Sequence, residues 1–245
     1  MSEQAAAAAT LAYGRRRWPE RTVMARLPER AGDELLALAP GVRYREGRVL
    51  VRQGARGTHV YLLEPAESGC CAYTKVTACL ENGREALLGI SVSGDLVGEQ
   101  AVLGQRRRSA TVVACSPLIA HPIPGDQFIA FLRRWPEAWQ AVALMITERL
   151  DWSDRRRLSF AGHDVRVHLA RVIVELVERH GYPVTGGYEL GVSLSQPELG
   201  RLIGAGQDAT ANAVSQLRRA GLVQTRYRGL VVRDLAGLRS AAGLK

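Results

Sequence analysis

An acidic residue lies nine positions ahead of an arginine–serine pair in the stretch GDLVGEQAVLGQRRRSATVVA, Gly94 to Ala114. The acid is Glu99, and the pair is Arg108 and Ser109. A carboxylate can accept hydrogen bonds from a sugar hydroxyl. An arginine followed by a serine can hold a phosphate through its charge, the hydroxyl and a backbone N–H. The pattern therefore predicts a binding site for an anion of nucleotide size.

Small residues near this acid and this pair would let a ligand come close to the backbone. Gly94 and Gly98 can adopt positive φ angles, so the turn before Glu99 can fold around a ligand. Ala110 leaves room beside Arg108. An alternative stays open, in which Arg108 pairs with Glu99 as a structural bridge and no ligand binds.

Short apolar runs and glycine-containing turns alternate from about Val42 to His121. The runs are typical of strands, and examples are VLV at 49–51, HVYLL at 59–63, EALLGI at 85–90 and SATVVA at 109–114. This spacing predicts a compact antiparallel sandwich or roll around the anion site, with a helix before it at residues 29–38. We expect residues 27–126 to form this domain and residues 1–26 to form a flexible extension.

The repeat in the sequence pattern changes between Asp126 and Ala161, where seven positions follow one another at steps of four and three residues. The repeated positions are Trp139, Ala143, Ile146, Leu150, Ser153, Arg157 and Phe160. Such a seam predicts one long helix, residues 127–162, that pairs with the same helix of a second copy. The alternative is a helix that packs only on its own sandwich.

Residues 163–245 are expected to form a separate C-terminal domain that begins with a helix. Asp164 is suited to cap this helix, and Gly181 and Pro183 should end it. One face of the helix carries Val165, Leu169, Val172, Ile173, Leu176 and Val177.

A helix-turn-helix is predicted further along. Ser195 and Glu198 have the spacing of a capping box, and a short helix should follow to Ile203. After the glycine turn at 204–206, a second helix should run from Gln207 to Ala220. The segments LVQTRY and GLVV flank a turn at 228–229 and predict a β-hairpin wing.

The second helix would place its first turns in the major groove of DNA. Candidates for base edges are Gln207, Asp208, Thr210, Ala211 and Asn212, whereas Ala209, Ala213, Val214 and Leu217 can face inward. Gln and Asn can pair with adenine, and Asp can accept from cytosine. Phosphate contacts are assigned to Arg201, Arg218, Arg219, Arg226 and Arg228, and the cap residue Ser195 is counted with this interface. The alternative is a helical hairpin used for protein packing.

The charge balance fits a polyanion partner. The 245 residues carry a formal net charge of +9. Residues 165–245 hold 11 Lys and Arg against 6 Asp and Glu, which makes this third the better candidate for the contact. No apolar run is long enough for a membrane span, and the start of the chain lacks the order of a secretory signal, so a cytoplasmic protein without membrane contact is expected.

Catalytic and metal sites are not expected. A cupin-like enzyme would need clustered His and Glu ligands, and the roll offers only His59 and His121, without HxH spacing. The cysteines form no CxxC pair and are expected to be small buried hydrophobes: Cys70, Cys71, Cys79 and Cys115.

The motifs G-D-L-V-G-E at 94–99 and R-S-A at 108–110 resemble the phosphate-binding cassette of cyclic nucleotide-binding domains. With the order of roll, long helix, hinge and winged helix-turn-helix, the chain resembles the Crp/Fnr family of bacterial transcription regulators over about residues 27–235. The resemblance implies an α+β fold with an N-terminal antiparallel β-roll, or double-stranded jelly roll. It implies a homodimer that binds double-stranded DNA, and also RNA polymerase. It further implies allosteric control by a small anionic effector such as cyclic AMP, and no enzymatic activity.

The resemblance also assigns roles to residues of the roll and the long helix. Glu99 would hold the ribose 2′-hydroxyl. Arg108 and Ser109 would hold the cyclic phosphate, with Gly98 and Ala110 alongside. The base would meet Ser153 and, where cyclic-AMP responders often carry a second hydroxyl, Asp154. Because Asp154 and its neighbour Trp152 depart from the cyclic-AMP pattern, the identity of the effector stays open.

In the C-terminal domain, the resemblance makes Asp164 the hinge acid. Gln207, Asp208 and Asn212 stand where many members have arginine, glutamate and arginine, so the familiar half-site is not expected. The alternative function is an effector-independent regulator or architectural DNA-binding protein with a vestigial ligand site.

Overall fold

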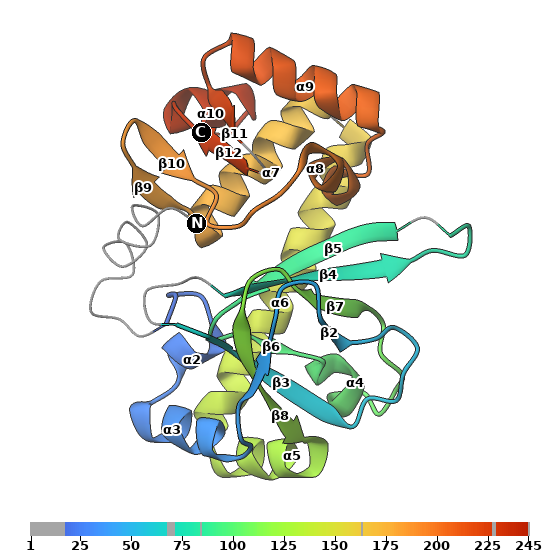
Figure 1. Ribbon diagram of the computed structural model, residues 1–245, viewed down its shortest axis with the longest axis vertical. Helices are drawn as coiled ribbons and strands as arrows, with labels where there is room; N and C mark the ends of the chain where they lie inside the picture. The colour runs from blue at the N-terminus through green and yellow to red at the C-terminus, as the bar shows by residue number, and fades with distance from the viewer. Residues whose placement is uncertain (1–17, 68–71, 84, 163, 227–228, 245) are drawn as a thin grey trace. The chain divides into compact units, whose positions relative to one another are not determined.

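The computed structural model describes residues 18–67, 72–83, 85–162, 164–226 and 229–244 (Figure 1). The described chain forms two compact units that divide between Leu150 and Asp151. This division lies inside helix α6 (Pro136–Gly162), earlier in the chain than the boundary expected near Gly162. The last turns of α6 therefore belong with the C-terminal unit.

The N-terminal unit is the predicted antiparallel roll, made of two four-stranded sheets. One sheet has the order β1 (Val42–Tyr44), β8 (Leu118–Pro124), β3 (His59–Pro65) and β6 (Leu96–Val97). The other has the order β2 (Val49–Val51), β7 (Thr111–Ala114), β4 (Tyr73–Cys79) and β5 (Glu85–Val92). In β7 the side chains alternate between half-buried and buried, with Val112 and Ala114 in the core, as a strand with one buried face requires.

Helices of this unit pack in one hydrophobic cluster with strands β3, β6 and β8 of the roll. These helices are α2 (Val23–Arg26), α3 (Glu29–Ala37), α4 (Glu99–Leu103) and α5 (Gly125–Arg134). The helix predicted at 29–38 is confirmed. Its Leu35 packs in one cluster with Leu62 of β3 and with Phe128 and Phe131 of α5. These large side chains are almost completely buried, so they fix the sheet against the helices.

The expected single helix from residue 127 to residue 162 is wrong, because α5 ends at Arg134 and α6 begins at Pro136. Trp135 between them has φ −119° and ψ 92°, which is extended backbone. Proline lacks an N–H and disfavours the helical conformation in the residue before it, so Pro136 begins a new helix. The seam positions from Trp139 onward all lie in α6.

The C-terminal unit begins with α7 (Val165–His180), which Asp164 caps by accepting a 2.8 Å hydrogen bond from the Val167 N–H. The helix ends at His180, before the predicted stop at Gly181. The segment after the stop forms a hairpin that the sequence reasoning missed, β9 (Tyr182–Val184) and β10 (Gly187–Glu189). This hairpin joins β11 (Val223–Arg226) and β12 (Gly229–Val232) in a sheet of order β11-β12-β10-β9 (Figure 1).

The predicted helix-turn-helix consists of α8 (Gln196–Ile203) and α9 (Gln207–Arg219). The Glu198 carboxylate accepts hydrogen bonds of 2.8 Å from both the backbone N–H and the hydroxyl of Ser195, which places the capping box where it was expected. Gly204 ends α8 with φ 70°, a left-handed conformation that favours glycine. A final helix, α10 (Leu235–Ala241), was not predicted.

Three further expectations concern cysteines, metals and membranes. The prediction of buried cysteines is wrong for Cys79, which is exposed at the end of β4, while Cys115 is half-buried. Cys70 and Cys71 lie outside the described residues. Within the described ranges, no group of three or more His, Cys, Asp or Glu could hold a metal ion. No helix in the described part of the chain has the length and apolarity that a membrane crossing needs.

Candidate effector site and DNA interface

Glu99 is the first residue of α4. Gly94, with φ 86°, lies before β6 and makes a separate turn, so of the two glycines only Gly98 directly precedes Glu99. Gly98 precedes it with φ 84°, a left-handed conformation that turns the chain from β6 into the helix. The Glu99 side chain is only 2% exposed. A buried carboxylate needs a compensating charge, and here Arg149 of α6 supplies it, with 2.8 Å between Arg149 Nη1 and Glu99 Oε1.

Arg149 is the functional candidate that the sequence reasoning missed. Besides Glu99, its guanidinium donates to the Ser91 hydroxyl at 3.1 Å and to the Leu96 carbonyl at 2.9 Å. It thereby joins α6 to the ends of β5 and β6. A sequence signal existed, because position 149 follows the inward-facing Val142 and Met145 at helical spacing. A charged residue on a buried face requires a partner inside.

Arg108 lies in the same unit and is 6% exposed. Its Nη1 donates to the Gly98 carbonyl at 2.6 Å, and its Nη2 donates to the His59 carbonyl at 2.5 Å. Burial lowers the pKa of the Arg108 guanidinium, and the nearby Tyr61 and Glu99 oppose this shift. A bridge between Arg108 and Glu99 is not formed, because each is occupied by other partners.

Gly98 and Arg108 fit each other closely. A Cβ atom on Gly98 would lie 2.3 Å from Arg108 Nη1 and 3.3 Å from the His59 carbonyl oxygen. The absence of a side chain at position 98 therefore admits the guanidinium. The glycine was singled out for a turn around a ligand, and that role stays a prediction.

The remaining predicted effector residues differ in position. Ser109 is exposed beside Arg108, and Ala110 is 8% exposed. Ser153 and Asp154 belong to the C-terminal unit, as part of the last turns of α6. Ser153 is half-buried, and the exposed Asp154 pairs with Arg157 at 3.8 Å. The roll therefore brings together Gly98, Glu99, Arg108 and Ala110, and the base-contact assignments of Ser153 and Asp154 stay predictions.

Helix α9 exposes most of the side chains predicted to reach DNA bases. Gln207, Asp208, Ala211 and Asn212 are exposed. Thr210 is a correction, because it is 1% exposed and its hydroxyl donates to the Gly206 carbonyl at 2.8 Å. It packs against α8 beside Gly200, where a Cβ would come within 2.7 Å of its hydroxyl.

Ala209 is the matching correction, since it was expected inside and is exposed. Thr210 takes the inward position that was assigned to Ala209. It packs on the same side as Ala213, Val214 and Leu217, which are buried as predicted.

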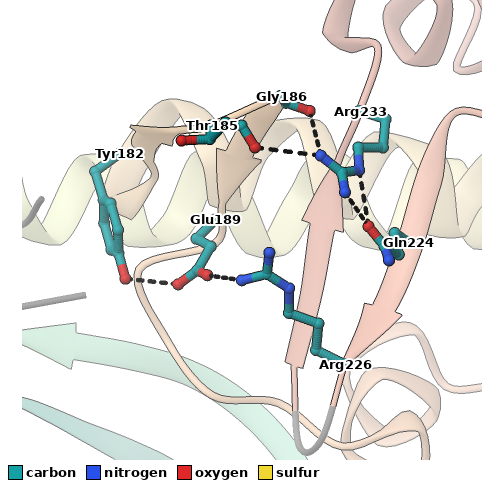
Figure 2. Close-up of polar contacts among 7 residues, drawn as sticks. All are labelled: Tyr182, Thr185, Gly186, Glu189, Gln224, Arg226 and Arg233. Atoms are coloured by element: carbon teal, nitrogen blue, oxygen red, sulfur yellow. Dashed lines mark hydrogen bonds and ion pairs between the residues drawn. The ribbon is translucent and has the colours of Figure 1, made fainter. Parts of the chain in front are cut away.

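The predicted phosphate contacts fall into two groups. Arg201, Arg218 and Arg219 are exposed on α8 and α9. Arg226, at the end of β11, is instead held by Glu189 of β10, with 2.6 Å between Arg226 Nη1 and Glu189 Oε1 (Figure 2). Arg228 lies outside the described residues.

A cluster at the end of α6 connects this helix to the helix-turn-helix within the C-terminal unit. The Arg156 guanidinium lies 4.0 Å from the centre of the Trp152 ring, and its Nη1 donates to the Leu202 carbonyl of α8 at 3.0 Å. Burial lowers the pKa of Arg156 to about 10, and Glu175 of α7 opposes the shift. Burial also raises the pKa of Glu175, although Arg155, at 3.3 Å, lowers it.

Both units match known protein families. Residues 41–134 match the cyclic nucleotide-binding domain, and residues 167–241 match the Crp-like helix-turn-helix domain. The chain is similar to a CRP-like cAMP-activated global transcriptional regulator of Mycobacterium tuberculosis, with 20% identity over 79% of this chain and 84% of that protein. It is also similar to the cAMP-activated global transcriptional regulator Vfr of Pseudomonas aeruginosa, with 23% identity over 82% of this chain and 92% of that protein.

Solved structures agree on the fold. The c-di-GMP responsive global regulator CLP of Xanthomonas campestris matches with a TM-score of 0.71 and 19% identity, over 84% of this chain and 100% of that chain. These relatives are transcription regulators, not enzymes. With a cyclic nucleotide-binding domain followed by a Crp-like helix-turn-helix, the chain belongs to the Crp/Fnr family of DNA-binding transcription regulators.

Proposed function

We propose that the protein is a homodimeric, sequence-specific transcription regulator whose DNA binding is controlled by a cyclic nucleotide in the roll. The observation that carries this proposal is the arrangement of Glu99, Arg108 and Arg149. A buried acid for a sugar hydroxyl and a buried arginine for a phosphate lie in one unit, and the acid is paired with α6.

Ligand binding would change these contacts. A cyclic phosphate would attract Arg108 more strongly than the neutral Gly98 and His59 carbonyls do, because charge-assisted hydrogen bonds are the stronger ones. A ribose hydroxyl at Glu99 would compete with Arg149 for the same carboxylate. The effector would thereby bind one of two positions of α6 more tightly than the other. Allosteric control needs such a difference in affinity between two conformations.

The proposed dimer contact is the exposed face of α6. Trp139 and Leu150 are 43% and 56% exposed, and Ala143 between them is exposed as well. They are three of the predicted seam positions, and the half-buried Ile146 completes the heptad spacing. Two copies joined there would present two reading helices about 34 Å apart, one turn of duplex.

The Arg156 cluster offers a route from α6 to the DNA-reading helices. Arg156 follows Ser153 by three residues on the same helix and binds the last turn of α8 through Leu202. Asp164, which caps α7, is the proposed hinge between them. The exposed Gln207, Asp208, Ala211 and Asn212 would read the operator, and RNA polymerase is the proposed partner at the promoter.

Calorimetry against a panel of cyclic mono- and dinucleotides tests the effector assignment. We expect one of them to bind the wild type and to lose binding in Arg108→Ala, while circular dichroism shows an unchanged fold. Wild-type affinity retained by Arg108→Ala would show that the cassette is misassigned.

One observation favours a second candidate, an effector-independent regulator. Both Glu99 and Arg108 are already satisfied by protein groups. If no cyclic nucleotide gives a heat of binding or alters DNA affinity, this second candidate replaces the first.

A further inference from the structure

The wing carries an arginine that already forms an ion pair with a carboxylate of the same unit. Arg226 is the last residue of β11, next to the wing turn, and its side chain is 49% exposed. Its Nη1 lies 2.6 Å from Oε1 of Glu189, whose side chain is 25% exposed. The acid is thus the more buried member of the pair.

Glu189 is held in place independently of Arg226. The Tyr182 hydroxyl of β9 donates to Oε2 of Glu189 at 2.7 Å, and the two residues are register partners in the β9–β10 ladder. Figure 2 shows the carboxylate between Tyr182 on one side and Arg226 on the other. Tyr182 therefore holds the Glu189 carboxylate in the position where Arg226 binds it.

A second arginine holds the two hairpins together by neutral contacts. Arg233 donates to the carbonyls of Thr185 and Gly186 in the β9–β10 turn and to the side chain of Gln224 in β11 (Figure 2). These bonds join the β9–β10 turn to β11 without using the charge at position 189, and β12 pairs with both β10 and β11. We therefore expect the sheet to remain folded without the Glu189–Arg226 pair.

We propose that Glu189 competes with the DNA backbone for Arg226 and so weakens the phosphate contact of the wing. A phosphate and a carboxylate attract the same guanidinium by the same kind of charge-assisted hydrogen bond. The Glu189 carboxylate partly neutralises the charge of Arg226 and turns its Nη1 toward β10, so less of that charge is left for a phosphate. Arg218 and Arg219 on α9 have no ion pair among the described residues. Competition from a carboxylate therefore weakens the phosphate contact of the wing and not those of the reading helix. The proposal rests on the DNA contact of the wing given above.

The test uses a fluorescein-labelled duplex of random sequence, about 30 base pairs long, because phosphate contacts are independent of sequence. Fluorescence anisotropy gives the affinity of the full-length protein at several salt concentrations. We expect Glu189→Gln to bind about 1.4- to 5-fold more tightly, since an exposed ion pair of this kind is worth about 0.2–1 kcal/mol. The plot of log affinity against log salt should steepen by up to about 0.9, one additional phosphate contact.

Two controls separate release of Arg226 from a general change of charge. Glu178→Gln removes a carboxylate that pairs with Arg239 in the same unit, and it should leave the affinity nearly unchanged. In the Arg226→Ala background, Glu189→Gln should no longer raise the affinity. Glutamine can still accept from Tyr182, and thermal melting should confirm that the variants remain folded.

The proposal is overturned if Glu189→Gln binds as the wild type or more weakly. It is also overturned if the gain persists with Arg226→Ala or is matched by Glu178→Gln. A wild type that binds no duplex at all would refute the DNA-binding function itself, which is a different result from binding without the gain.

Discussion

Replacing Arg149 by methionine would leave the Glu99 carboxylate buried without its ion-pair partner. Glu99 is 2% exposed, and its Oε1 lies 2.8 Å from Arg149 Nη1, so water cannot easily replace the lost hydrogen bond. Breaking a buried ion pair on one side costs about 3–5 kcal/mol. The Arg149 side chain is 28% exposed, which places the expected loss at the low end, about 3 kcal/mol.

Differential scanning calorimetry measures this loss, because it can separate the unfolding of the roll from that of the C-terminal unit. A destabilisation of about 3 kcal/mol corresponds to a fall of about 6–12 °C in the Tm of the roll. The double variant with Glu99→Gln should recover much of the loss, since a neutral amide costs less to bury than an unpaired carboxylate. The reasoning is refuted if Arg149→Met leaves the Tm unchanged, or if the effects of the two substitutions simply add.

The other predictions concern a glycine, a reading residue and a titrating acid. Gly98→Ala should destabilise the roll by about 1–3 kcal/mol in thermal unfolding, because φ is 84° and the new Cβ would meet Arg108. Gly47→Ala, also at positive φ but with open space around it, should destabilise the roll less than Gly98→Ala does. If both variants lose the same stability, the clash with Arg108 does not contribute to the loss. Asn212→Ala should weaken discrimination at one base pair by about 1–3 kcal/mol in competition binding with single-base variants, and an equal loss on all sequences would mark a backbone contact instead. Because burial raises the pKa of Glu175 above 4.5, the folded state holds its proton more tightly, so the stability that Glu175 contributes should decline as pH rises from that value. In calorimetric melts at pH values above 4.5, Glu175→Gln should reduce this loss of stability with rising pH. If the stability of the variant depends on pH as that of the wild type does, burial of Glu175 is not the cause.

The turn before Glu99 and the helix-turn-helix could be predicted because their signals are local. Gly98 and Glu99 are neighbours, and the turn they form depends on a backbone conformation that favours glycine. Ser195 and Glu198 are three residues apart and cap the helix by direct hydrogen bonds. Pro136 is an equally local signal, but the expected single helix over residues 127–162 overlooked it, although the missing N–H and the restriction on the preceding residue explain the break between α5 and α6.

Pairings between distant residues could not be predicted in the same way. Arg149 meets Glu99 from 50 positions away, and Arg226 meets Glu189 from 37 positions away. These contacts depend on which helix lies on which sheet edge and on how the strands pair. The exchange of Ala209 and Thr210 has a different cause, since one helical step changes the direction of a side chain by 100° and both residues are small enough for either side.

The central claim is that a ligand at Glu99 and Arg108 controls DNA binding. The most direct measurement is the affinity of the wild type for DNA fragments from its own promoter region, with and without cyclic AMP and cyclic di-GMP, by fluorescence anisotropy. We expect at least one of the two nucleotides to change the affinity by about 5- to 150-fold, with no change in Arg108→Ala. Equal affinity with and without both nucleotides, or the same change in Arg108→Ala, would contradict the account.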